Sequence, residues 1–143
     1  MSAATLYTPE VLNLATGLAD YPWNEALPLR IQKRSRACGS VVDLALALDD
    51  NGRVSGIGIR SQACAIGQAA AAIFVRDAHG RTGAEIAAAL HEIETWQRSA
   101  GAVPEWPGFT AIAAAQAFPG RHAAIRLPWE AARPLLCSAA IPR

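Results

Sequence analysis

The sequence lacks the features that mark several classes of protein. Its net charge is only +1, with 13 Lys and Arg against 12 Asp and Glu, so the charge balance favours neither nucleic acid nor an anionic membrane as a partner. The apolar run 66–75 is interrupted by Gln68 and is too short to span a membrane. The N-terminus has no basic segment followed by an apolar core, so we expect no secretory signal.

Motifs for common enzyme chemistry are also missing. No glycine-rich phosphate-binding loop joins a predicted strand to a helix, and no Ser-His-Asp or Cys-His arrangement has a base at a suitable spacing. Cysteine is scarce, with three residues in the chain. An odd number of cysteines without an export signal favours reduced thiols in the cytoplasm over a disulfide framework.

What is present fits one domain, 1–143. The chain is 52% hydrophobic, largely because alanine is abundant, so it can bury a core. Segments 27–36, 41–48 and 53–60 predict strands, the first of them a half-exposed edge strand, and Asn51-Gly52 suits a tight hairpin turn. Gly56 and Gly58 leave room on one face of the third strand for a helix or a partner backbone. We predict an antiparallel three-stranded meander.

Helices are predicted around this sheet, over residues 4–18, 65–78, about 82 to 96 or 98, 110–117 and 127–136. Thr8 suits an N-cap, and Thr82 with Glu85 forms a capping-box pattern. Pro128 fits the first turn of the last helix, whereas Pro134 should end or kink it. The predicted fold class is therefore α+β, a three-stranded antiparallel sheet packed against several helices in a single domain.

The tryptophans and two of the histidines have simple interpretations. Three tryptophans are expected in the core or at an interface, and Trp23 on an exposed surface near the N-terminus. His79 and His91 are expected at solvated positions of predicted helices. The three core tryptophans are Trp96, Trp106 and Trp129.

Two of the cysteines lie at the ends of predicted elements. Cys38 precedes a predicted strand, and Cys64 lies at the junction between a strand and an alanine-rich helix. Their separation of 26 residues is about the length of one β-hairpin, so the two sulfurs could meet at one end of the sheet. A free cysteine often only fills space in a core, but element ends next to small residues favour ligands. Cys137 is expected to be structural or incidental.

Several short motifs follow one another along the chain. They are Leu6-Tyr7 with Val11-Leu12, Ala37-Cys38-Gly39, Leu44-Ala45-Leu46 with Asn51-Gly52-Arg53-Val54, Ala63-Cys64 with Gly80-Arg81, and Phe118-Pro119-Gly120-Arg121 with Leu127-Pro128-Trp129. In this order, and with this cysteine spacing, the chain resembles the IscU/NifU/SufU family of iron–sulfur cluster assembly scaffolds, closest to the SufU branch. The resemblance covers roughly residues 5–136 and implies a NifU-like N-terminal-type domain.

The chain departs from the family pattern at the ligand positions. Ser40 stands where the family usually has aspartate, and Ala124 where it has a third cysteine. The residue before that cysteine, a histidine in the IscU branch, is Ala123 here, and His122 is one place away.

From the resemblance, Cys38 and Cys64 are the expected ligands of iron or a labile iron–sulfur cluster, with Ser40 and His122 as secondary candidates. Sites for iron or zinc use about four ligands, so two thiolates fill half of one, and zinc fits less well. Two chains facing each other would supply the four thiolates of a [2Fe–2S] cluster; a small thiol or a partner protein could also complete the site. The implied partners are a cysteine desulfurase and other assembly proteins, with a homodimer as one arrangement.

Two alternatives stay open. One thiol could accept a persulfide sulfur from a cysteine desulfurase, which needs a single exposed and activated thiolate. The dipole of the following helix would favour such a thiolate at Cys64, and Arg36 or Arg60 could add positive charge near either sulfur. The protein could instead be a metal-free interaction module that kept the fold and lost the chemistry. In each of these roles it is not an enzyme.

Overall fold

The computed structural model describes residues 6–99 and 101–140, and the side chains of its last helix as far as Leu136. Its three-stranded antiparallel sheet has the order β1-β2-β3, with bounds Leu29–Arg34, Val41–Leu48 and Val54–Gln62. The predicted meander is confirmed, with β2 at the predicted residues. In the β2–β3 turn, Asp49 Oδ1 accepts hydrogen bonds from the backbone N–H groups of Asn51 and Arg53, and Gly52 has a φ of 76°. The turn chemistry of this segment therefore holds the hairpin.

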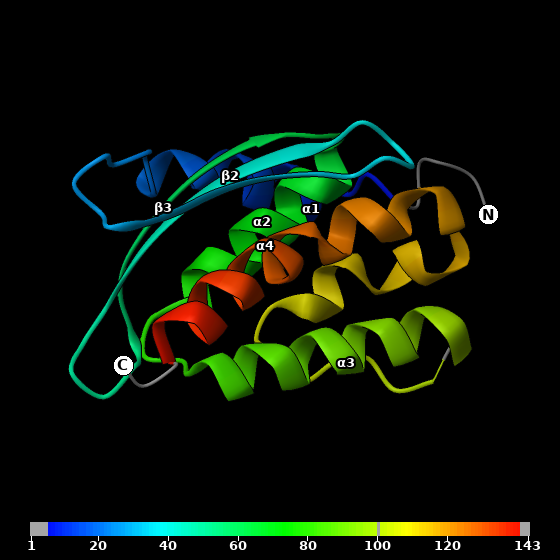
Figure 1. Ribbon diagram of the computed structural model, residues 1–143. Coiled ribbons are helices and arrows are strands. Elements are labelled where there is room, and N and C mark those ends of the chain that lie inside the picture. Colours follow the sequence, from blue (N-terminus) through cyan, green and yellow to red (C-terminus); the bar gives the residue numbers. More distant parts are fainter. Residues whose placement is uncertain (1–5, 100, 141–143) are drawn as a thin grey trace.

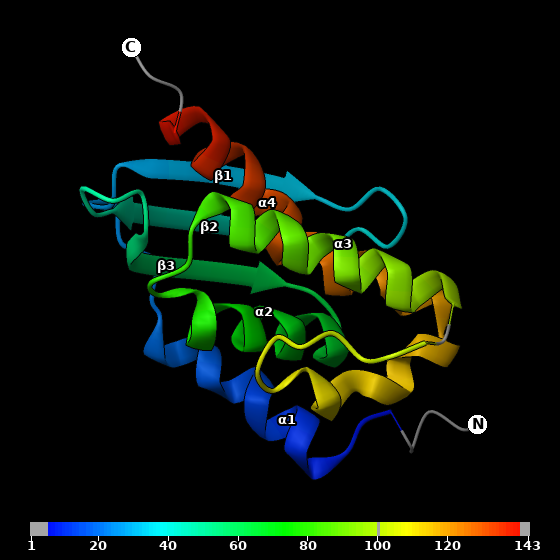
Figure 2. The ribbon, with the colours of Figure 1, turned by 90° about the horizontal axis from the view of Figure 1, so that it is seen from below.

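The helices lie on one face of the sheet (Figure 1). Helix α2 packs under β3, α4 packs under β1 and β2, and α3 packs against α4 on the side away from the sheet; Figure 2 shows α1 alongside α2. None of the described helices is long and apolar enough to cross a lipid bilayer. The bounds of the helical elements are α1 Pro9–Thr16, η2 Gly17–Asp20, α2 Ala65–Ala78, α3 Gly83–Ser99, η3 Phe109–Ala117, η4 Pro119–Arg121 and α4 His122–Ala140.

The predicted helix starts are largely confirmed. The Thr8 side chain caps α1 by accepting a hydrogen bond from the backbone N–H of Val11. At α3 the capping box is reciprocal, because Thr82 Oγ1 accepts from the N–H of Glu85 and Glu85 Oε1 accepts from the N–H of Thr82. The prediction for the first helix began at residue 4. Residues 4 and 5 lie outside the described part of the chain, and residues 6–8 are not helical, because α1 begins after its cap at Thr8.

The last helix differs most from its prediction. It was expected over 127–136 and to end or kink at Pro134, but α4 begins at His122 and continues through Pro128 and Pro134 to Ala140. Each interior proline removes one helical hydrogen bond and costs about 3 kcal/mol. Burial offsets this, since each fully buried large apolar side chain contributes about 1.5–3 kcal/mol. The large buried side chains of α4 are Ile125, Leu127, Trp129 and Leu136.

The segment 110–117 also departs from the expected regular helix. It forms the 3₁₀ element η3, with a non-helical residue at Ile112 (φ −112°). A 3₁₀ turn is tighter than an α-helix and holds poorly beyond a few residues, so a kink within this length is expected. The kink leaves Phe109, Ile112 and Ala115 buried, which suggests that packing decides the local conformation here.

The core is built around aromatic rings, as predicted for three of the tryptophans. Trp129 is fully buried, and its ring lies edge-on to Phe74 and Trp106 at 5.3 and 5.4 Å between centroids. Trp106 Nε1 donates to the carbonyl oxygen of Ile73 at 2.9 Å. This cluster, with Trp96 on Phe109, fixes the packing of α2, α3 and α4 beneath the sheet.

A strap, defined here as residues 21–28, crosses β3 on the face of the sheet that points away from the helices. A Cβ atom added at Gly58 would lie 2.5 Å from the carbonyl oxygen of Pro22, and one at Gly56 would lie 2.9 Å from a methyl group of Leu27. The two glycines therefore admit another part of the same chain at van der Waals distance. Trp23, expected on the surface, is half-buried under the Arg60 guanidinium, 4.5 Å from its ring centroid.

Candidate functional site

Cys38 lies at the tip of the loop between β1 and β2. This loop closes tightly, because the N–H of Ser35 donates to the carbonyl of Ser40 at 2.8 Å and the N–H of Gly39 donates to the carbonyl of Ser35 at 2.9 Å. Gly39 adopts a φ of 73°, which glycine tolerates and other residues rarely adopt. The loop holds the Cys38 side chain in an exposed position.

Two serine hydroxyls contact the Cys38 sulfur. Ser40 Oγ lies 3.1 Å from it and Ser35 Oγ 3.4 Å, and both serines are buried. Burial raises the pKa of the Cys38 thiol, but the hydrogen bonds of Ser35 and Ser40 and the nearby charge of Arg121 bring it below its ordinary value. Once the thiol ionises, both hydroxyls can donate to the thiolate. The serines thus form a hydrogen-bonding cradle for an anionic sulfur.

Cys64 lies where β3 passes into α2, as the sequence predicted. It is the N-cap residue of α2, with extended backbone (φ −63°, ψ 169°), and its carbonyl accepts the N–H of Gln68 at 2.9 Å. Its side chain makes no capping hydrogen bond and is half-buried. The sulfur is therefore not engaged by its own helix, although it stands at the positive end of the helix dipole.

Arg121 links the two cysteine loops electrostatically. A hydrogen bond to Tyr7, followed by the charges of Tyr7, Cys64 and Cys38, raises the pKa of Arg121 above its ordinary value. Its Nε donates to Tyr7 Oη at 3.2 Å, which ties the guanidinium to the segment before α1. The β2–β3 register pairs Val41 with Gln62, so the loop of Cys38 and the cap position of Cys64 lie at the same end of the sheet. This end, with Cys38, Cys64 and Arg121, is called the cysteine corner below.

The position of the missing third cysteine faces this same corner. Ala124 is buried in the first turn of α4, with 3% of its surface exposed. A Cβ added at Gly67 of α2 would lie 3.1 Å from the Ala124 Cβ and 3.9 Å from the Cys64 sulfur. The methyl group of Ala124 therefore packs against Gly67, on the side of α2 that also faces the Cys64 sulfur, at the position where the resembling family has a thiol.

The secondary candidates, Ser40 and His122, lie in different surroundings. Ser40 contacts the Cys38 sulfur, whereas His122 Nε2 lies 2.8 Å from the carbonyl oxygen of Gln116 and 3.2 Å from that of Ala115. The His122 ring also lies 6.3 Å from that of Trp96. Its imidazole is therefore engaged with η3 and α3.

The donor set of the corner is small. Among residues 6–99 and 101–136, no group of three or more His, Cys, Asp or Glu side chains could hold a metal ion. Two thiolates are soft ligands that suit iron, but they supply half of a tetrahedral coordination shell. The residues present therefore fit the edge of a metal cluster and do not fit a closed mononuclear site.

Three groups of the corner were missed by sequence reasoning. Ser35 carries no motif signal, and Tyr7 and Arg121 were noted only as parts of resembling segments. Arg60, one of the two cations suggested near the sulfurs, instead lies over Trp23 and pairs with Asp43 at 3.5 Å. Tyr7 and Arg121 are more than a hundred residues apart, so only the folded chain reveals their contact.

Comparison with solved structures places this fold among iron–sulfur scaffold proteins. A NifU-like protein (N-terminal) from Brucella abortus matches with a TM-score of 0.83 and 23% sequence identity, covering 95% of this chain and 96% of that one. A Fervidobacterium islandicum protein, named as an iron–sulfur cluster assembly scaffold for the SUF system, matches with a TM-score of 0.82 and 17% identity, covering 94% and 99%. The α+β fold predicted from the resemblance is therefore confirmed: the chain has the fold of the NifU-like and SufU-type scaffolds.

Sequence-level comparisons add nothing to this. No protein-family model matches the chain, and no curated protein matches it.

Proposed function

We propose that this protein is a non-enzymatic member of the IscU/NifU/SufU family that carries iron or a labile iron–sulfur cluster between Cys38 and Cys64. The observation that carries the proposal is the sheet register, in which Val41 pairs with Gln62 and brings the segments of Cys38 and Cys64 to the same end of the sheet. The charge of Arg121 favours the thiolate of Cys38, and the thiolate is the form of cysteine that ligates metal. The fold shared with the two scaffold proteins supports the same role.

The ligand count determines how cargo would be held. In a [2Fe–2S] cluster each iron takes two protein ligands, so Cys38 and Cys64 together can serve one iron. The second iron needs two further thiolates, which a second copy of this chain, a small thiol or a partner protein can provide. Because the chain supplies only two of the four cluster ligands, it holds the cluster loosely. Loose binding suits a protein that passes the cluster on.

Anaerobic reconstitution with ferrous iron and sulfide tests this role. The wild-type protein should gain visible charge-transfer absorbance, and Cys38→Ser and Cys64→Ser should each lose most of it while keeping the same circular dichroism spectrum. Cys137→Ser is the matched control and should load like the wild type. Equal, featureless spectra for the wild type and both site variants would rule out cluster binding.

A second role is favoured by the environment of Cys38. Its exposed thiol has a lowered pKa and two hydroxyl neighbours, which suits a nucleophile. As a sulfur acceptor, the Cys38 thiolate would attack the outer sulfur of a cysteine desulfurase persulfide. A new S–S bond forms at Cys38, the S–S bond of the donor breaks, and the donor cysteine leaves as a thiolate, so no external oxidant is needed.

Mass spectrometry separates this role from the first. After incubation with a cysteine desulfurase and cysteine, the peptide containing Cys38 should gain one sulfur atom, and Cys38→Ser should abolish the gain. Sulfur found only on the peptide containing Cys137 would contradict it. In both roles the proposed partners are a cysteine desulfurase and other assembly proteins, and the proposed location is the cytoplasm.

A further inference from the structure

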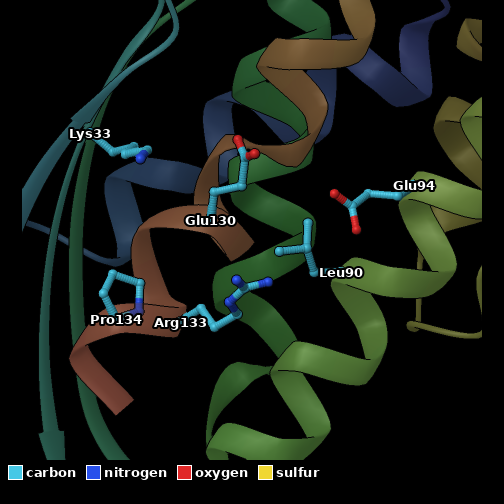
Figure 3. Close-up of a pocket in the computed structure, with 6 residues that line it drawn as sticks. All are labelled: Lys33, Leu90, Glu94, Glu130, Arg133 and Pro134. Carbon is cyan, nitrogen blue, oxygen red and sulfur yellow. The ribbon is translucent and has the colours of Figure 1, made fainter. Parts of the chain in front are cut away.

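A pocket lies between β1, α3 and α4, away from the cysteine corner. It has a volume of about 480 Å³, within the size range of small-molecule sites. Figure 3 shows its side chains reaching toward a shared space from three elements. The lining residues are Lys33, Leu90, Glu94, Glu130, Arg133 and Pro134.

Strand alternation and helical spacing bring these side chains together. Lys33 pairs with Val42 in the sheet register, at the end of the row of β1 residues that faces the helices. Leu90 and Glu94 are one turn apart on α3, and Leu90 is buried. The pocket therefore has an apolar contact at Leu90 and charged groups around it.

The charges in the pocket do not neutralise one another. Within the described chain, neither Lys33 nor Arg133 forms a salt bridge, and Glu94 forms none. Glu130 alone is paired, with Arg126 on its own helix at 3.6 Å. The pocket thus presents two uncompensated cations and one uncompensated carboxylate.

An interior proline of α4 leaves one backbone acceptor without its helical donor. Pro134 has no N–H, so the carbonyl oxygen of Glu130 lacks the donor that an α-helix normally supplies four residues later. Glu94 and the Glu130 carbonyl are both groups that an ammonium ion can satisfy.

We propose that this pocket binds an acidic amino acid, a small molecule with two carboxylates and one ammonium group. The two carboxylates pair with Lys33 and Arg133, and the ammonium pairs with Glu94. The lining holds two cations and two carboxylates, and one of these carboxylates, Glu130, is paired with Arg126. The remaining two cations and one anion match this ligand in number and sign, whereas a neutral amino acid leaves one cation unmatched. This proposal does not rest on the cysteine chemistry. An experiment can therefore refute the ligand of the pocket without refuting the role of Cys38 and Cys64, and the reverse also holds.

Binding of L-glutamate, measured by NMR titration of the full-length protein, tests the proposal against two probes that each lack one charge. L-Glutamine has no side-chain carboxylate, and glutarate has no ammonium group. L-Glutamate should saturate the protein and bind several-fold more tightly than either. Similar shifts with all three compounds would overturn the proposal. So would the absence of a saturable shift with L-glutamate at concentrations up to roughly 50 mM.

Substitutions of the charged pocket residues test which side chains contact L-glutamate. Lys33→Gln and Arg133→Gln should each weaken L-glutamate binding about two- to fivefold, the range expected for an exposed charge pair. Glu94→Gln should weaken L-glutamate and leave glutarate unchanged or tighter. Arg30→Gln, an exposed charge on the opposite face of β1, is the control and should bind as the wild type does. Equal affinities in all four variants would contradict the assignment.

Discussion

At the scale of single residues, the chemistry of the corner centres on Cys38 and its two serines. The resembling family usually has aspartate where this chain has Ser40. A carboxylate there would add a metal ligand, but its negative charge would oppose ionisation of the thiol. A hydroxyl donates a hydrogen bond to the thiolate without that repulsion. The replacement therefore favours a reactive, anionic sulfur over a filled metal site.

Ser40→Ala should raise the pKa of Cys38. Ser40 stabilises the charged form, so its removal moves the pKa upward toward or past its ordinary value. The rate of Cys38 alkylation rises with pH as the thiolate forms, and the midpoint of that rise should lie at higher pH in the variant. Peptide mass spectrometry after iodoacetamide pulses at a series of pH values gives the midpoint. Ser40→Asp should shift it further up, and an unchanged midpoint in both variants would contradict the cradle.

Arg121→Gln should also raise the pKa of Cys38, because the variant removes a positive charge that favours the thiolate. It should reduce iron–sulfide loading as well, because the thiolate is the form of cysteine that ligates metal. Arg60→Gln is the control, because its guanidinium lies over Trp23 and should leave both measurements unchanged. A larger change in the Cys38 pKa or in iron–sulfide loading for Arg60→Gln than for Arg121→Gln would contradict the assignment of Arg121 as the cation of the site.

Ala124→Cys should strengthen cargo retention. Position 124 faces the Cys64 corner through Gly67, so a third thiolate there would complete most of a coordination shell. After reconstitution, the variant should lose its visible absorbance to a chelator more slowly than the wild type. Ala123→Cys, the adjacent position on α4, is the matched control. Equal rates of loss in the two variants would show that position 124 does not face the cargo.

At the scale of elements, prediction succeeded where local pattern and burial agree. Strand β2 alternates apolar residues toward the helices, and α2 is a run of small helix formers after Cys64, so both were predicted at their observed residues. Helix α4 was misjudged because Pro128 is typical of the first turn of a helix and Pro134 gives a local stop signal. That signal is overcome by burial of Ile125, Leu127 and Trp129 against other elements, which a local pattern does not reveal.

Gly58→Ala should destabilise the protein by about 1–3 kcal/mol, the usual cost of overpacking. Its new methyl group would meet the Pro22 carbonyl oxygen at 2.5 Å, and backbone cannot easily move aside. Gly17→Ala is the matched control, since Gly17 has a helical φ of −67° and no atom within 4 Å of an added Cβ. Denaturant midpoints of both variants would check this. Equal midpoints would mean that the strap over β3 does not pack as described.

At the scale of the whole molecule, the corner is assembled from four distant parts of the chain. The loop of Cys38 and the cap position of Cys64 could be predicted, because turn residues and a helix start mark them in the sequence. Tyr7 and Arg121 could not, because their contact depends on how α1 and α4 pack around α2. The aromatic core around Trp129 sets that packing, so it also determines which cation reaches the sulfurs.

The convergence of Cys38 and Cys64 on one corner is the claim on which the proposed function depends. It can be tested in the Cys137→Ser variant with a short bifunctional alkylating reagent, followed by digestion and mass spectrometry. The structure predicts one dominant product, in which a single reagent molecule bridges the peptides containing Cys38 and Cys64. Iron bound by the two cysteines should block the formation of this product. Only separate, singly attached adducts on the two cysteines would contradict the shared corner.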